Sequence, residues 1–142
     1  MFDDLQGKVI LVTGASTGIG AAAASAFGAA GARVAVHYNA SADAAKEVVA
    51  SIAAAGGQAQ AFRANATQSQ ALQQLLDDVV ARWGRIDVLV NNAGNLFGRK
   101  AFADSDETFL DELLNLNVKS VVRLSRAILP VFKRQGLSLI HI

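Results

Sequence analysis

The sequence has no cysteine among its 142 residues, which excludes disulfide frameworks, thiol catalysis and cysteine-based zinc sites. It has a single proline and no low-complexity stretch that would mark a linker between domains. An excess of charge of one sign is also missing, because 13 Lys and Arg residues are scattered among 12 Asp and Glu residues. Without a basic block, nothing predicts binding to nucleic acid or to an anionic membrane surface.

Long hydrophobic runs are absent as well. Charged residues interrupt every apolar stretch well before the ~18 residues that a membrane span needs. The first residues, with Asp3, Asp4 and Lys8, do not resemble the basic end and apolar stretch of a signal peptide. A composition that is 52% hydrophobic excludes a disordered chain, and the length fits one domain or a piece of a larger one. We therefore expect a globular, cytoplasmic protein.

The apolar period alternates between the strand and the helix patterns along the chain. Short runs predict strands over 8–13, 33–38, 58–63 and 86–90. Between them, helices are predicted over 18–30, from a cap at Ser41 to Gly56, and from a capping box at 67–70 to Gly84. This order predicts an α/β fold with a doubly wound parallel sheet of the Rossmann type.

A longer helical pattern covers 106–135, and its apolar surface is broader than one sheet face requires. Either this surface fills the core, or a second partner covers part of it. Residues 137–142 then either begin a fifth strand or are the translation of a sequencing-library adapter, because they back-translate to CTG-TCT-CTT-ATA-CAC-ATC. We expect the Rossmann-type portion to occupy 1–136 and the sheet to be truncated after about the fifth strand.

The strongest local signal is the glycine-rich segment Thr13-Gly14-Ala15-Ser16-Thr17-Gly18-Ile19-Gly20, between a predicted strand and a predicted helix. Gly14 permits a sharp turn, Gly18 a close approach to a pyrophosphate, and Gly20 close packing of helix on strand. The N–H groups at the start of the helix would then hold the anion. A purely structural turn is the alternative. A P-loop is excluded because Ala21 follows the last glycine, and the spacing also differs from Gly-x-Gly-x-x-Gly.

At these residues the chain resembles the classical branch of the short-chain dehydrogenase/reductase family. The glycine segment is accompanied by Asn91-Asn92-Ala93-Gly94 after the fourth strand and by Asn117 in the long helix. The resemblance covers about 2–136, and it is greatest to 3-oxoacyl-carrier-protein reductase-like and glucose-dehydrogenase-like members. It implies an NAD(P)-dependent oxidoreductase that transfers hydride between a nicotinamide cofactor and a carbonyl or alcohol substrate, such as an acyl thioester or a sugar.

The resemblance also implies a role for individual residues. Ser16, Thr17 and Ile19 would line the adenosine and pyrophosphate part of the cofactor, together with Gly14, Gly18 and Gly20. Asn65 and Ala66 would lie beside the adenine, where the family usually has Asp and an apolar residue, and the Asn65 carbonyl could pair with the adenine edge. Asn92, Ala93 and Gly94 would lie near the ribose. Asn117 matches the catalytic Asn whose backbone carbonyl holds a water in the proton relay.

The choice between the two nicotinamide cofactors is made where the second strand ends. An acidic residue there favours the free 2′-hydroxyl of NAD(H), but this chain has Tyr38, Asn39 and Ser41, with no carboxylate before Asp43. NADP(H) is therefore preferred, and NAD(H) use stays open. The Arg that phosphate-binding members often carry is replaced by Thr17.

The catalytic Ser, Tyr and Lys of the family would follow the long helix, and none can be assigned here. The only tyrosine is Tyr38, and the sequence has no Tyr-x-x-x-Lys. We therefore expect an N-terminal fragment that is inactive alone and, at full length, a homo-oligomer (dimer or tetramer) pairing through the long helix. The alternative is a non-catalytic nucleotide-binding or sensing module.

Other polar residues have structural explanations. His37 and His141 are expected to be surface or strand-edge residues and not metal ligands. The pair at 77–78 is expected to face solvent, with Asp78 bonded to Arg82 one helical turn later. Trp83 is expected to pack the end of its helix.

Overall fold

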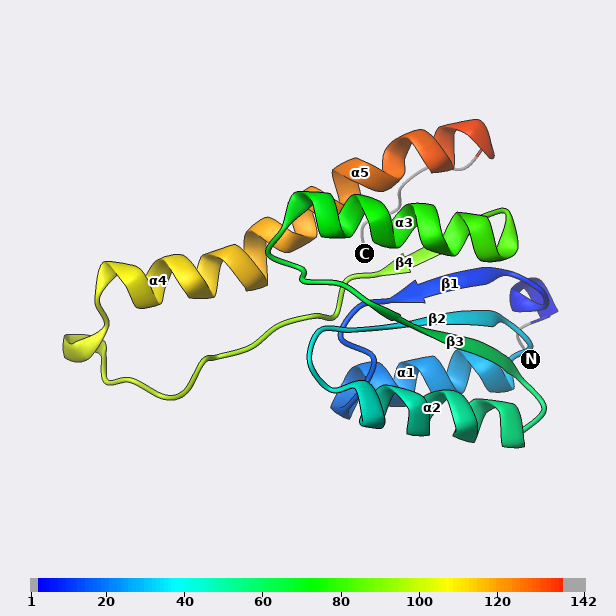
Figure 1. Ribbon diagram of the computed structural model, residues 1–142, viewed down its shortest axis with the longest axis horizontal. Coiled ribbons are helices and arrows are strands. Elements are labelled where there is room, and N and C mark those ends of the chain that lie inside the picture. Colours follow the sequence, from blue (N-terminus) through cyan, green and yellow to red (C-terminus); the bar gives the residue numbers. More distant parts are fainter. Residues whose placement is uncertain (1–2, 137–142) are drawn as a thin grey trace.

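The computed structural model describes residues 3–136, with the side chains from Asp4 onward. It contains a four-stranded parallel sheet in the order β3-β2-β1-β4 (Figure 1). The strands are β1 (Val9–Val12), β2 (Arg33–Tyr38), β3 (Gln58–Arg63) and β4 (Val88–Val90). The two interpretations of residues 137–142 concern a segment outside the described residues.

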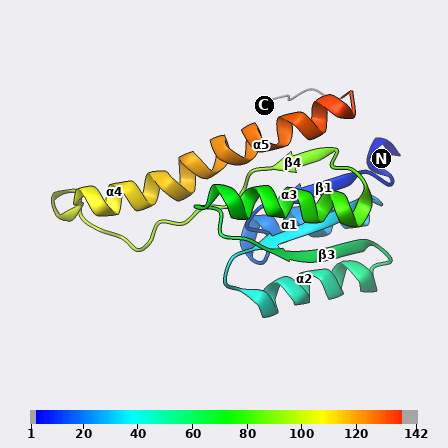
Figure 2. The same ribbon diagram turned by 45° about the horizontal axis from the view of Figure 1, so that its top comes forward.

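Helices cover both faces of the sheet. α1 (Gly18–Ala29) and α2 (Ala42–Ala54) lie on one face, whereas α3 (Ser69–Trp83) and α5 (Ser120–Arg134) lie side by side on the other, as Figures 1 and 2 both show. The predicted α/β fold with a doubly wound parallel sheet is confirmed. The chain winds from β1 outward to β3 and then returns to place β4 on the other side of β1, so the direction of winding reverses between β1 and β4.

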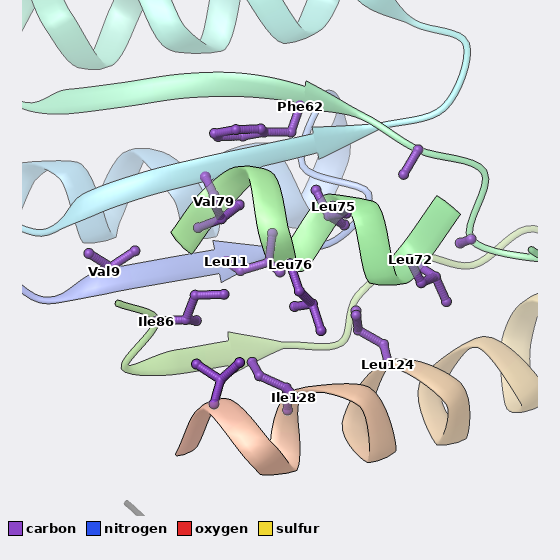
Figure 3. Packing of buried hydrophobic residues seen from close by; sticks show 14 of the residues in the cluster. Val9, Leu11, Phe62, Leu72, Leu75, Leu76, Val79, Ile86, Leu124 and Ile128 are labelled. Atoms are coloured by element: carbon purple, nitrogen blue, oxygen red, sulfur yellow. The ribbon is translucent and has the colours of Figure 1, made fainter. Parts of the chain in front are cut away.

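The core consists of two apolar layers, because alternate residues of each central strand point to opposite faces. Val9 and Leu11 of β1 pack under α3 and α5, whereas Ile10 and Val12 pack over α1 and α2. Figure 3 shows the first layer, in which Leu11 lies among buried side chains of α3 and α5. Burying each large aliphatic side chain contributes about 1.5–3 kcal/mol. Trp83 packs against this layer in an edge-on contact with Phe62, as predicted.

Asp87 fixes β4 against β1. Its carboxylate accepts the Val9 N–H at 2.9 Å and pairs with Arg85. Burial opposes ionisation, but the hydrogen bonds from Arg85 and Val9 outweigh it and lower the pKa of Asp87. The carboxylate therefore stays ionised at the beginning of the strand that leads to the site.

The predicted long helix is present as one continuous element with a widened turn inside it. α4 (Glu107–Leu114) runs into a π-helical turn (Asn115–Lys119) and then into α5. Asp106 caps the beginning, with its Oδ1 accepting the Phe109 N–H at 2.9 Å. α4 extends away from the sheet (Figures 1 and 2). Among the described residues, no helix is both long and apolar enough to cross a membrane.

Three expected side-chain interactions in the helices are wrong. Ser41 occupies the N-cap position of α2, but its side chain makes no capping hydrogen bond. No capping box forms at 67–70, because α3 begins at Ser69 and Gln68 makes no side-chain cap. Asp78 does not bond to Arg82: it accepts from Gln74, and Arg82 donates to Gln60 at 2.7 Å instead. β3 lies within reach of α3, so the arginine pairs across elements and not along its own helix.

Candidate functional site

The glycine segment forms a tight loop between β1 and the beginning of α1. Gly14 has φ +61°, and a Cβ there would lie 2.9 Å from the Ala93 Cα. A Cβ on Gly20 would overlap the Gly14 carbonyl oxygen and the Asn92 side-chain amide. The third glycine therefore allows the helix to approach the loop itself, and not only the strand as expected. Gly18 has φ +57° and open space around it.

The N–H groups from Ser16 to Gly20 donate to no protein acceptor in the part of the chain that the structure describes. Thr17, at the N-cap of α1, makes no side-chain cap, and the first turn holds no acidic residue. The loop thus presents unpaired donors at the positive end of a twelve-residue helix. Such an arrangement can hold an anion such as a phosphate.

Thr13 joins this loop to the segment after β4. Its Oγ1 donates to the Val90 carbonyl at 3.3 Å and accepts the N–H groups of Asn92 and Ala93 at 2.9 and 3.0 Å. The Asn92 side chain returns two hydrogen bonds, each 3.0 Å long, to the carbonyl oxygens of Thr13 and Gly14. The glycine loop and the Asn-Asn-Ala-Gly segment therefore form one connected unit.

His37 lies beneath the glycine loop and is 1% exposed, so its predicted surface or strand-edge position is wrong. Its Nδ1 accepts the Gly14 N–H at 3.0 Å, and the proton on Nε2 is donated to the Ala64 carbonyl at 3.0 Å. Burial lowers the pKa of His37, although the bond to Ala64 opposes this shift. β2 is an interior strand with helices on both faces, which leaves no exposed side at this position.

The segment after β3 is fixed by a second polar cluster. Asn65 Oδ1 accepts the Thr67 N–H at 3.0 Å and its hydroxyl at 2.8 Å. This oxygen is thereby used inside the turn, contrary to the expectation that it is free to pair with a base. Arg123 of α5 donates to the Thr67 carbonyl at 3.2 Å and to Asn115 at 2.6 Å, which ties the turn to the π-helical turn.

A cleft of about 700 Å³ opens at the carboxyl ends of the strands. It lies where the winding reverses, which is where sheets of this type bind ligands. Twelve of the residues predicted for the site line it: Gly14, Ser16, Thr17, Ile19, Tyr38, Asn39, Ser41, Asn65, Ala66, Asn92, Ala93 and Gly94. Gly18, Gly20 and Asn117 do not line it. Sequence reasoning missed eight lining residues: His37, Ala40, Thr67, Asn95, Phe97, Glu112, Asn115 and Leu116.

Asn117 lies in the π-helical turn and orders the wall of this cleft. Its Nδ2 donates to the carbonyl oxygens of Asn95 at 2.8 Å and Leu113 at 2.9 Å, and its Oδ1 accepts the Asn95 N–H at 3.1 Å. The side chain is therefore fully used in holding the segment after β4. π-helical turns are rare and often occur at functional sites, but the glycine and asparagine motifs alone gave no signal for one.

The charges around the cleft are few. Glu112 is the one acidic residue that lines it among residues 4–136. Asp43, the first carboxylate after β2, is almost fully exposed and lies 3.5 Å from Lys46. No cluster of three His, Asp or Glu residues that could hold a metal occurs in the described part of the chain.

Comparison with known proteins agrees with this geometry. The family model described as short chain dehydrogenase matches residues 8–141. The 7alpha-hydroxysteroid dehydrogenase of Escherichia coli K12 is 41% identical over 132 residues, which are 93% of this chain and 51% of that protein. An NADH-dependent reductase solved with NAD has a TM-score of 0.88 and 35% identity, over 96% of this chain and 56% of the other.

A dehydrogenase from Burkholderia cenocepacia with bound NADP has a TM-score of 0.81 and 35% identity, over 87% of this chain and 48% of the other. The chain spans about half the length of these relatives. The family match covers nearly all of the sequence, and the fold and the glycine loop are consistent with it. The chain therefore belongs to the short chain dehydrogenase family.

Proposed function

We propose that this chain is the cofactor-binding portion of an NADP(H)-dependent oxidoreductase that acts on a carbonyl or alcohol substrate. The observation that carries the proposal is the row of unpaired N–H groups from Ser16 to Gly20 at the beginning of α1. Ser16, Thr17 and Ile19 of this row line the cleft. This donor set fits the pyrophosphate of a dinucleotide, and the cleft volume fits a ligand of that size. When bound, the nicotinamide supplies or accepts the hydride.

Of the remaining residues of the cleft, some would contact the adenosine half of the dinucleotide and others the nicotinamide half. The adenosine half would lie at the ends of β2 and β3, among Tyr38, Asn39 and Asn65. The nicotinamide half would lie beside β4, against Asn92 and Gly94. The Asn117 side chain holds the segment after β4, which leaves its backbone carbonyl as the group proposed for the proton relay. These residues supply no tyrosine as proton donor, because the only tyrosine of the sequence is Tyr38 and it would lie at the adenosine half of the cleft.

The preference for NADP(H) rests on charge at the end of β2. No carboxylate lies there to accept the 2′-hydroxyl of NAD(H) or to repel a 2′-phosphate. Arg63, the last residue of β3, donates from Nε to the Asn39 carbonyl at 3.1 Å. Its guanidinium therefore lies beside the loop that would meet the ribose, and its other nitrogens can donate to a phosphate.

Calorimetric titration of the protein with both oxidised cofactors tests this preference. We expect NADP to bind at least tenfold more tightly than NAD. The variant Arg63→Met should reduce the affinity for NADP and leave that for NAD unchanged, whereas Arg126→Met on the exposed side of α5 should change neither. Tighter binding of NAD would reject the preference, and binding of neither would reject the proposed function.

We also propose that a second copy of the chain covers the exposed side of α4, the π-helical turn and the beginning of α5. Leu110, Leu114, Val118 and Val122 recur every four residues and are 42–60% exposed. Four large apolar side chains on one helix face form a contiguous patch of the kind found at protein interfaces. The core is already filled by other residues of this helix, such as Leu124 and Ile128, so these four have no role in it.

A further inference from the structure

Two successive N–H groups of the glycine loop are bonded to one residue, His37 of β2. The Gly14 N–H donates to the His37 Nδ1 atom at 3.0 Å, and the Ala15 N–H donates to the His37 carbonyl oxygen at 2.8 Å. His37 therefore binds the beginning of the loop through its side chain and through its backbone. These two donors are directed at β2 and are not available to a ligand in the cleft.

The N–H groups that follow are free for a ligand. Those from Ser16 to Gly20 donate to no protein acceptor among residues 3–136, and pairing resumes at the Ala21 N–H, which donates to the Thr17 carbonyl at 3.3 Å. The change from paired to unpaired donors thus comes directly after the two residues that His37 binds. Because Gly14 has φ +61° and no side chain of its own to hold it, the loop depends on its neighbours for this orientation.

The geometry permits only one neutral form of the imidazole. A backbone N–H only donates, so the Nδ1 atom opposite Gly14 carries no proton. The ring proton is then on Nε2, and the Ala64 carbonyl oxygen accepts it at 3.0 Å. This second bond fixes the orientation of the ring by tying it to the residue that follows β3. Since His37 is almost completely buried, both bonds are shielded from water.

We propose that His37 is a positioning residue for pyrophosphate binding, which it supports through the glycine loop. It holds the N–H side of the peptide group between Thr13 and Gly14, and the Asn92 amide holds the carbonyl side of the same peptide group at 3.0 Å. With this peptide group fixed, the donors after it meet the anion without a rearrangement of the loop, and preorganisation of this kind increases affinity. The inference rests on the proposed function, because it concerns the same anion site.

Two variants separate the two bonds of the ring. His37→Asn retains an acceptor for the Gly14 N–H, whereas His37→Gln retains a donor for the Ala64 carbonyl and loses that acceptor. In calorimetric titration with oxidised NADP, we expect His37→Asn to bind within about threefold of the wild-type protein, and His37→Gln about tenfold more weakly, the effect of one lost hydrogen bond. Val34→Ala is the matched control, because it opens a cavity at a buried position of the same strand. It should lower the urea midpoint and leave the affinity unchanged.

NMR of the wild-type protein decides the matter if His37→Gln fails to fold. The N–H groups of Gly14 and Ala15 should exchange with solvent about tenfold or more slowly than those of Thr17 and Gly18, and the proton of the His37 ring should be on Nε2. Fast exchange at Gly14, a proton on Nδ1, wild-type affinity in His37→Gln, or an equal loss of affinity in both His37 variants would each overturn the assignment. Failure of the wild-type protein to bind NADP would instead overturn the proposed function and this assignment with it.

Discussion

Mild acid should destabilise this protein through one buried imidazole. Neutral His37 accepts the Gly14 N–H at 3.0 Å, and a proton on Nδ1 would place two donors opposite each other. Burial lowers the pKa of His37 below its ordinary value of 6.5. Below that value the unfolded chain binds a proton that the folded chain does not, so the free energy of unfolding falls as the pH falls. Above it, the stability that His37 contributes is fully present.

The size of the effect has a clear upper limit. While His37 stays neutral in the folded state, the free energy of unfolding changes by about 1.4 kcal/mol per pH unit. Between pH 8 and pH 5.5 the total loss then reaches at most about 1.4 kcal/mol, because the unfolded imidazole titrates near 6.5. At this upper limit, the loss is about a tenth to a quarter of the stability of a typical domain.

Urea unfolding between pH 5.5 and pH 8 measures this loss. His37→Asn retains an acceptor for the Gly14 N–H but cannot titrate, so its free energy of unfolding should be nearly flat over this range. His141→Gln removes the other histidine of the sequence and should preserve the wild-type slope. A wild-type protein as insensitive to pH as His37→Asn would refute the reasoning.

Two further predictions concern the loop and the exposed helix face. Gly18 and Gly56 both have positive φ and open space around them, so Gly18→Ala and Gly56→Ala should each cost about 1 kcal/mol of stability in urea unfolding. Only Gly18→Ala should weaken cofactor binding in a titration, and equal effects of the two would argue against the loop as the anion site. Leu114→Glu should reduce the molar mass measured by light scattering to that of a monomer, whereas Thr108→Glu on the same helix should not. Identical masses would exclude the proposed pairing surface.

The sequence was sufficient to predict the fold because its signals are local. The strands and helices alternate in period, and β2 and β3 begin and end at the predicted residues. The glycine loop could be placed because its spacing and its position between a strand and a helix depend on neighbouring residues only. Twelve predicted residues line the cleft for the same reason, since they follow the ends of predicted strands.

Contacts between residues that are far apart in the sequence could not be predicted from these local patterns. His37 is buried because β2 lies inside the sheet, and its partners Gly14 and Ala64 are 23 and 27 residues away. Arg82 pairs with Gln60 of β3, and no helical spacing indicates that partner. In the π-helical turn, Asn117 bonds to Asn95 of the segment after β4, and only the folded chain brings these two residues together.

Thr13 shows how narrowly chemistry constrains one position at the centre of the protein. Its hydroxyl gives one proton to the end of β4 and receives two from the segment that follows. A valine would fill the same volume but could neither give nor receive. The N–H groups of Asn92 and Ala93 would lose their partner, whereas the Val90 carbonyl would keep the Thr13 N–H. A side chain with a hydroxyl group is therefore needed at this position to hold the segment after β4 against the glycine loop.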